Sequence, residues 1–285
     1  ELWNVIRNKL PTALKPALQV VRLAQEIEDW PTVVEAVDAY SGSPDVRLLT
    51  AKGYALCKMA GEVESPDWCE GIETLERAIA LSDEAIVPHL CLGELWELHQ
   101  PVRALEHFRQ AFALDSSNPM ALAGYIRCNM VKEQSCSFVP LLQPNIERAM
   151  SRCAELTAAG ADLPHGLYCM AWLHLLLRVE HGYQSLELLA RAVHQTVVAP
   201  APLLQALRDV SQLADYATGR PDIECARRFL SAALWAKFPG LAWPADTEPP
   251  RATPLKPDGA VVIVAGSCDA FHASIVKGHE GLLRT

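Results

Sequence analysis

A helical pattern that recurs with a period near 34 residues constrains the fold of this chain more than any other feature. Each copy places a small residue first, a large apolar residue four positions later, and a second small residue three positions after that. Four copies have this spacing: Gly71/Leu75/Ala78, Ala104/Phe108/Ala111, Ser185/Leu189/Ala192 and Cys225/Phe229/Ala232. Residues at these offsets share one face of a helix, and small residues there let a partner helix approach closely. Self-similarity at this period predicts a stack of helical hairpins, each burying its apolar face against its neighbours.

The pattern resembles the tetratricopeptide repeat. That family has a small residue within the first helix of each hairpin, a small/large/small triplet in the second helix, and a closing turn that often contains proline. Gly93, the second of the four triplets and the turn Asp115–Pro119 carry the resemblance in one copy. The resemblance implies an all-α fold, with roughly six hairpins over residues 1–238 wound into a right-handed α-α superhelix. It also implies a concave groove that binds a protein or peptide.

In this family, inward-facing positions of the first helix of each hairpin line the groove. Carrying those positions over, with Gly53, Gly93 and Gly124 as the equivalent small residues, assigns nine residues to the groove. They are Arg47, Thr50, Tyr54, Lys58, Glu94, Glu97, Asn118, Tyr125 and Asn129. This mixture of charges, amides and tyrosines suits an extended polypeptide better than an apolar small molecule. The alternative, that these residues form ordinary solvated helix faces, stays open.

Charge and hydropathy narrow the partners. The chain carries 25 Lys and Arg residues against 34 Asp and Glu residues, and no basic stripe with interleaved aromatic residues occurs. Because nucleic-acid binding depends on neutralising phosphates, we expect no nucleic-acid partner. The longest apolar run, Leu167–Leu177, is too short to span a bilayer, so no membrane partner is predicted. Nine scattered cysteines without C-x-x-C spacing suit free thiols in a reducing compartment, which favours a cytoplasmic location.

No arrangement typical of a catalytic or metal site is visible. Histidines occur without the H-E-x-x-H pattern, and there is no G-x-S-x-G nucleophile elbow. The cysteines also lack the paired spacing of a structural zinc site. We therefore expect no catalytic residues, no metal ligands and no cofactor in this region.

The composition changes after Phe238. Six prolines between residues 239 and 257 predict an extended linker. Residues 258–285 begin with β-branched residues, reading VVIVAGSCD at 261–269, and continue into a segment that we expect to open a helix. A strand, a Gly-Ser turn and a helix are how a doubly wound α/β domain begins.

The stretch 261–269 resembles the start of the Rossmann-like SLOG domains, which sense or hydrolyse nucleotide derivatives. The resemblance implies that four residues of the first turn contact a nucleotide derivative: Gly266, Ser267, Cys268 and Asp269. The alternative is an ordinary core strand and turn, since the turn holds one glycine and no phosphate-binding motif.

Two functions follow as hypotheses. In the first, the chain is a protein-interaction scaffold or sensor array of a multidomain signalling protein, an arrangement that resembles prokaryotic defence systems. In the second, it is the regulatory region of a nucleotide-binding or nucleotide-hydrolysing enzyme whose active domain begins near residue 258. Neither the ligand nor the oligomeric state can be predicted from the residues.

Overall fold

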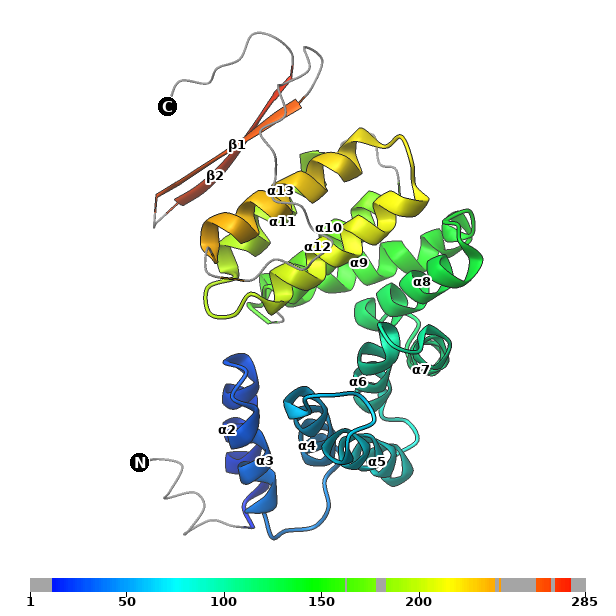
Figure 1. Ribbon diagram of the computed structural model, residues 1–285, viewed down its shortest axis with the longest axis vertical. Helices are drawn as coiled ribbons and strands as arrows, with labels where there is room; N and C mark the ends of the chain where they lie inside the picture. The colour runs from blue at the N-terminus through cyan, green and yellow to red at the C-terminus, as the bar shows by residue number, and fades with distance from the viewer. Residues whose placement is uncertain are drawn as a thin grey trace. The chain divides into compact units, whose positions relative to one another are not determined.

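The computed structural model describes residues 12–161, 163–177, 183–238, 241, 260–267 and 270–277 (Figure 1). Up to residue 238 the described residues are helical, with twelve α-helices, one short 3-10 helix and no strand. The chain divides into two compact units, residues 1–132 and 133–285, and the boundary falls at the end of α8.

The first unit is built from helices α2 to α8. Their bounds are α2 (Leu14–Glu26), α3 (Trp30–Asp38), α4 (Val46–Met59), α5 (Pro66–Leu81), α6 (Ile86–Glu97), α7 (Pro101–Leu114) and α8 (Pro119–Glu133). Consecutive helices pack in pairs, α4 with α5 and α6 with α7, as expected for stacked hairpins. The all-α prediction for this part is confirmed.

Short polar residues and prolines define where these helices begin. Asp45 precedes α4, and its carboxylate accepts a hydrogen bond from the backbone N–H of Arg47 at 2.9 Å. Ser65 precedes α5, and its hydroxyl accepts the N–H of Trp68. Pro66 follows at the first helical position, where a missing N–H costs no hydrogen bond.

The Phe108 ring of α7 packs between two glycines from neighbouring helices. A Cβ atom at Gly93 of α6 would lie 2.7 Å from this ring, and one at Gly124 of α8 would lie 2.3 Å from it. Contacts this short essentially never occur, so neither position accepts a side chain unless the ring moves. Phe108 thereby holds α6, α7 and α8 together, and Gly93 and Gly124 have the close-packing role that the repeat pattern predicts.

Helices α4 and α5 meet at a second pair of glycines. A Cβ atom added at Gly53 would lie 2.7 Å from the carbonyl oxygen of Gly71, and one at Gly71 would lie 2.7 Å from the carbonyl oxygen of Gly53. Here the obstruction is backbone, which cannot rotate away as a side chain can. Leu75 and Ala78 are fully buried beside this crossing, which confirms the first predicted triplet as a packing face.

The second unit contains η1 and helices α9 to α13. Their bounds are η1 (Val139–Leu142), α9 (Gln143–Ala158), α10 (His165–Leu176), α11 (Tyr183–Gln195), α12 (Ala201–Tyr216) and α13 (Pro221–Lys237). Lys237 at the end of α13 donates to carbonyl oxygens at the end of α11, including that of Thr196 at 2.7 Å. A cation is stabilised at the negative end of a helix, so this contact fixes α13 against α11.

One predicted triplet is out of phase with the structure. On α13, Ala232 is exposed and Cys225 is only half-buried, whereas Ala226, Leu230 and Ala233 have the same spacing and are buried. The shift is one residue, which turns the packing face by about 100°. Phe229 and Leu230 are both buried large residues, so spacing alone could not decide which of them is central to the packing face.

The C-terminal segment differs from the prediction. Residues Ala260–Ser267 form β1 and Ala270–Lys277 form β2, and the two pair antiparallel with Ser267 opposite Ala270. The helix expected over 270–284 is therefore a strand over 270–277, and the start of a Rossmann-like domain is not supported. The short connection explains the difference, because two residues can join antiparallel strands whereas a parallel crossover needs a dozen or more.

Four residues were assigned to a nucleotide-contacting turn. Of these, Gly266 and Ser267 lie within β1, while Cys268 and Asp269 lie outside the described residues, so nucleotide contact by this segment stays a prediction. Of the predicted linker 239–257, only residue 241 is described. Among the described helices, none has the length and apolar character needed to cross a membrane.

The α4–α5 crossing yields a stability prediction. Replacing Gly71 with Ala places a Cβ atom 2.4 Å from the Cys57 sulfur and 2.7 Å from the Gly53 carbonyl oxygen. Overpacking costs about 1–3 kcal/mol, which outweighs the roughly 0.5–1 kcal/mol that alanine gains over glycine within a helix. We expect Gly71→Ala to lower the free energy of unfolding by about 1–2 kcal/mol in urea titrations.

Gly61→Ala is the matched control, since nothing lies within 4 Å of a Cβ atom at Gly61. Equal unfolding midpoints for the two variants would show that α4 and α5 do not approach closely at Gly71.

Candidate interaction surface on the first unit

Three of the predicted groove residues form one cluster that links α4 to α6. The Tyr54 hydroxyl donates to Glu94 Oε1 at 2.5 Å, and Lys58 Nζ lies 3.0 Å from the same oxygen. Lys58 also lies over the Tyr54 ring, 4.9 Å from its centre, a cation–π arrangement. We call Tyr54, Lys58 and Glu94 the α4–α6 cluster. Through these side-chain contacts the cluster joins α4 to α6, which are the first helices of two successive hairpins.

Trp30 extends this cluster to α3. Its ring meets the Tyr54 ring edge-on, with centres 5.6 Å apart. Burial raises the pKa of the Tyr54 hydroxyl well above its ordinary value, and the negative charge of Glu94 raises it further. The phenol therefore stays protonated and keeps donating to Glu94. About half of the side-chain surface of Glu94 remains exposed, at 46%, so a ligand could still reach this carboxylate.

Arg47 and Thr50 lie on the same helix and behave differently. The Arg47 side chain is 64% exposed and pairs with Asp45 at 2.8 Å. Its hydrogen bond is the largest influence on the Asp45 carboxyl, whose pKa it lowers. Thr50 is buried, and its hydroxyl donates to the carbonyl oxygen of Val46 at 2.6 Å. Arg47 is therefore available to a partner, whereas Thr50 has a structural role.

Glu97 contacts an arginine that the sequence analysis did not single out. Arg127 of α8 donates to both carboxylate oxygens of Glu97, at 2.6 and 3.0 Å. Arg127 is buried, and its guanidinium lies 6.0 Å from the centre of the Phe108 ring. A guanidinium matches a carboxylate in this two-bond geometry, so the pair fixes α6 against α8. The sequence signal was Arg127 itself, a charged residue in an otherwise apolar stretch of helix.

The α8 residues assigned to the groove also contact their own unit. Asn118 accepts the backbone N–H groups of Met120 and Ala121 at 3.0 and 3.1 Å, as a helix cap does. The Tyr125 ring stacks on Phe112, with centres 5.3 Å apart. Asn129 donates to the carbonyl oxygen of Tyr125 at 2.8 Å. Among the nine predicted residues, Arg47, Lys58 and Glu94 are the exposed ones, so these three and the Tyr54 ring beside Lys58 are the side chains that define a surface.

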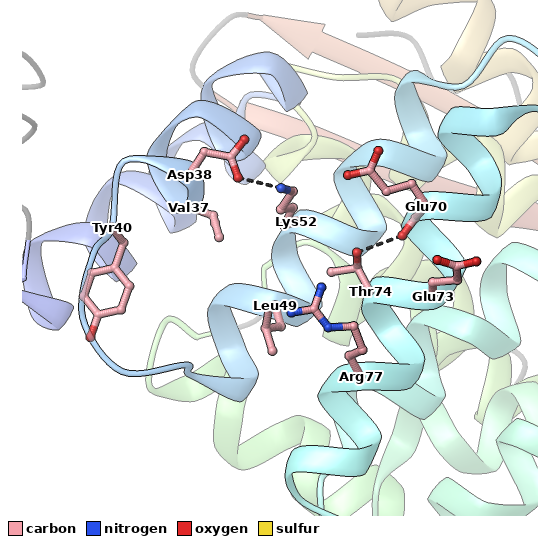
Figure 2. Close-up of a pocket in the computed structure, with 9 residues that line it drawn as sticks. All are labelled: Val37, Asp38, Tyr40, Leu49, Lys52, Glu70, Glu73, Thr74 and Arg77. Carbon is pink, nitrogen blue, oxygen red and sulfur yellow. Dashed lines mark hydrogen bonds and ion pairs between the residues drawn. The ribbon is translucent and has the colours of Figure 1, made fainter.

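A separate hollow of about 310 Å³ lies between α3, α4 and α5 (Figure 2). Figure 2 shows Lys52 reaching from α4 to Asp38 on α3, at 2.5 Å, and Arg77 extending from α5 toward Leu49. The hollow is lined by Val37, Asp38, Tyr40, Leu49, Lys52, Glu70, Glu73, Thr74 and Arg77. The sequence analysis named none of these residues, because charges of both signs at helical spacing are typical of any solvated face.

In the part of the chain that the structure describes, no three or more His, Cys, Asp or Glu side chains are grouped so as to hold a metal ion. A comparison with known protein families and with curated proteins finds no match for this sequence. The surface must therefore be interpreted from its own chemistry.

The buried pair of Glu97 and Arg127 yields a second prediction. Glu97→Leu leaves Arg127 buried without its carboxylate partner, and breaking a buried pair in this way costs roughly 3–5 kcal/mol. Replacing both residues, Glu97→Leu with Arg127→Met, removes both charges, and we expect it to recover most of that loss. Chemical unfolding of the parent and the two variants measures the difference. If the double variant is no more stable than the single one, the pair is not the contact that holds α6 to α8.

Proposed function

We propose that residues 1–238 act as a protein-interaction scaffold or sensor array, with helical hairpins wound into a right-handed superhelix. Their inner helices would bind an extended segment of a partner protein. The observation that carries this proposal is the α4–α6 cluster, in which Tyr54, Lys58 and Glu94 combine an aromatic ring with accessible charges of both signs.

The cluster has the properties of a recognition surface for a polypeptide. A tyrosine offers a large contact area with few rotatable bonds, and its position is already set by Trp30 and Glu94. Arg47 on the same helix adds an exposed guanidinium, which suits a carboxylate of the partner. Charges of both signs favour a segment that carries both acidic and basic groups, since they set the register of binding more than its strength.

The remaining groove residues support the proposal indirectly. Glu97, Arg127 and Asn118 hold α6 and α8 in place through buried or capping hydrogen bonds. A rigid scaffold loses little conformational entropy when a partner binds, so side chains with structural contacts contribute preorganisation. The recognition surface is accordingly smaller than the row of nine residues that the repeat resemblance suggested.

The experiment uses the full chain in affinity capture to obtain a partner, followed by calorimetry with the isolated partner. Arg47→Glu combined with Lys58→Glu inverts two charges on the proposed surface, and we expect it to weaken binding by roughly tenfold or more. Circular dichroism checks that the variant keeps its helical content.

Arg109→Glu is the matched control. Arg109 is a similarly exposed arginine on α7, and it pairs with the neighbouring Glu106 at 3.1 Å. Binding should be unchanged in this control. Parent-like affinity of the Arg47→Glu/Lys58→Glu variant would place the interface elsewhere.

A further inference from the structure

Two histidines join α6 to α7 at a place distinct from the α4–α6 cluster. His89 Nδ1 lies 3.3 Å from His107 Nδ1, and the ring centres are 5.6 Å apart. The centre-to-centre distance exceeds the Nδ1–Nδ1 distance by about the radius of one imidazole ring on each side. The two Nδ1 atoms therefore face each other along the line that joins the rings. Both side chains are half-buried, so water reaches them only partly.

This geometry limits how many protons the pair can hold. A neutral imidazole has one nitrogen that donates and one that accepts, so one ring can present an Nδ1–H to the bare Nδ1 of the other. A first added proton leaves this hydrogen bond in place, now between an imidazolium and a neutral ring. A second added proton would turn two N–H groups and two positive charges toward each other, which breaks the contact.

The surroundings do little to relieve that repulsion. Apart from His89 itself, the charged groups that act on His107 are Glu106 and Arg103, both on α7, and His89 is influenced by burial. Glu106 is 63% exposed and is engaged by Arg109. Burial and then the charge of His89 lower the pKa of His107 to about 4, Glu106 opposes this, and Arg103 adds to it. Burial also lowers the pKa of His89.

We propose that the His89–His107 pair is an acid-sensitive lock on the α6–α7 hairpin. One hydrogen-bonded proton between the two Nδ1 atoms holds the helices together at neutral pH. Because the folded pair resists protonation, acid favours the unfolded chain, and a second added proton would push the two helices apart. Because α6 also carries Glu94 and Glu97, and α7 carries Phe108, opening the lock weakens the contacts that join this hairpin to α4 and α8. The lock is independent of what the array binds.

The sign of the effect follows from the depressed pKa values. A base whose folded pKa lies below its ordinary value of about 6.5 binds fewer protons in the folded state than in the unfolded state. The pair's stabilisation is therefore complete above pH 6.5 and is lost as the pH falls toward 4. Three carboxyl groups have pKa values lowered below their ordinary values of 3.8 and 4.5: those of Asp45, Asp222 and Glu224. Between pH 6.5 and 5 these groups stay ionised, so a change in stability over this range does not come from them.

Nuclear magnetic resonance of the full chain with labelled histidine tests the shared proton directly. We expect His89 and His107 to titrate as a coupled pair whose second step lies well below pH 6.5. In His107→Phe, which keeps an aromatic ring but cannot take a proton, the coupled step at His89 should disappear. Independent single steps near pH 6.5 for both rings of the parent would overturn the lock.

Thermal unfolding at pH 7 and pH 5 tests the consequence for the fold. Between these two pH values we expect the thermal midpoint of the parent to fall by about 2–4 °C more than that of His107→Phe. A roughly fivefold change in the folding equilibrium gives a shift of this size in a domain of this length. His174 in the second unit also has a pKa lowered by burial, but it contributes equally to both proteins.

His194→Gln is the control, because His194 is exposed on α11 and should leave the parent's acid response unchanged. Equal losses in the parent and His107→Phe would overturn the proposal. A shallower acid response in His107→Phe, together with the coupled titration, would establish it.

Discussion

The packing of Phe108 between Gly93 and Gly124 is the contact on which the first unit depends. A phenyl ring of this size fits between α6 and α8 only where both helices lack a side chain. The ring of this α7 residue then buries a large apolar area against α6 and α8 at once, and such burial is the main favourable term in folding. The Gly53–Gly71 crossing repeats the principle with backbone against backbone, so within the first unit close helix approach occurs where the repeat places a glycine.

Around these crossings, polar side chains form hydrogen bonds and ion pairs that hold neighbouring helices in alignment. Tyr54, Lys58 and Glu94 join α4 to α6, and the pair of Glu97 and Arg127 joins α6 to α8. A repeat array is stabilised mainly by contacts between neighbouring units, and hydrophobic packing alone is not directional. Directional bonds between first helices therefore supply what the apolar core lacks. Of these side chains, Tyr54, Lys58 and Glu94 also belong to the surface that we propose for binding, so in the α4–α6 cluster alignment and recognition use the same residues.

The predicted groove residues show where sequence reasoning loses precision. The repeat resemblance assigned Tyr54, Lys58 and Glu94 to neighbouring first helices, and the structure brings them into contact. It could not show that Asn118 would cap α8, because capping depends on where the helix begins. It also gave no sign that Arg127 would face Glu97, since a contact across two hairpins depends on how closely they stack.

The sequence by itself determined that the described residues before 238 are helical, because the small/large/small spacing places three residues on one face of a helix, which is a local property. It also determined the approximate position of most helices, since proline, serine and aspartate define their first turns. Tertiary packing decided which face of α13 packs against the other helices, because Phe229 and Leu230 are both buried and the repeat spacing fits either of them. The strand pairing of residues 260–277 was decided by β1 and β2 together, because a β-branched segment takes a stable form only when a second strand satisfies its backbone hydrogen bonds.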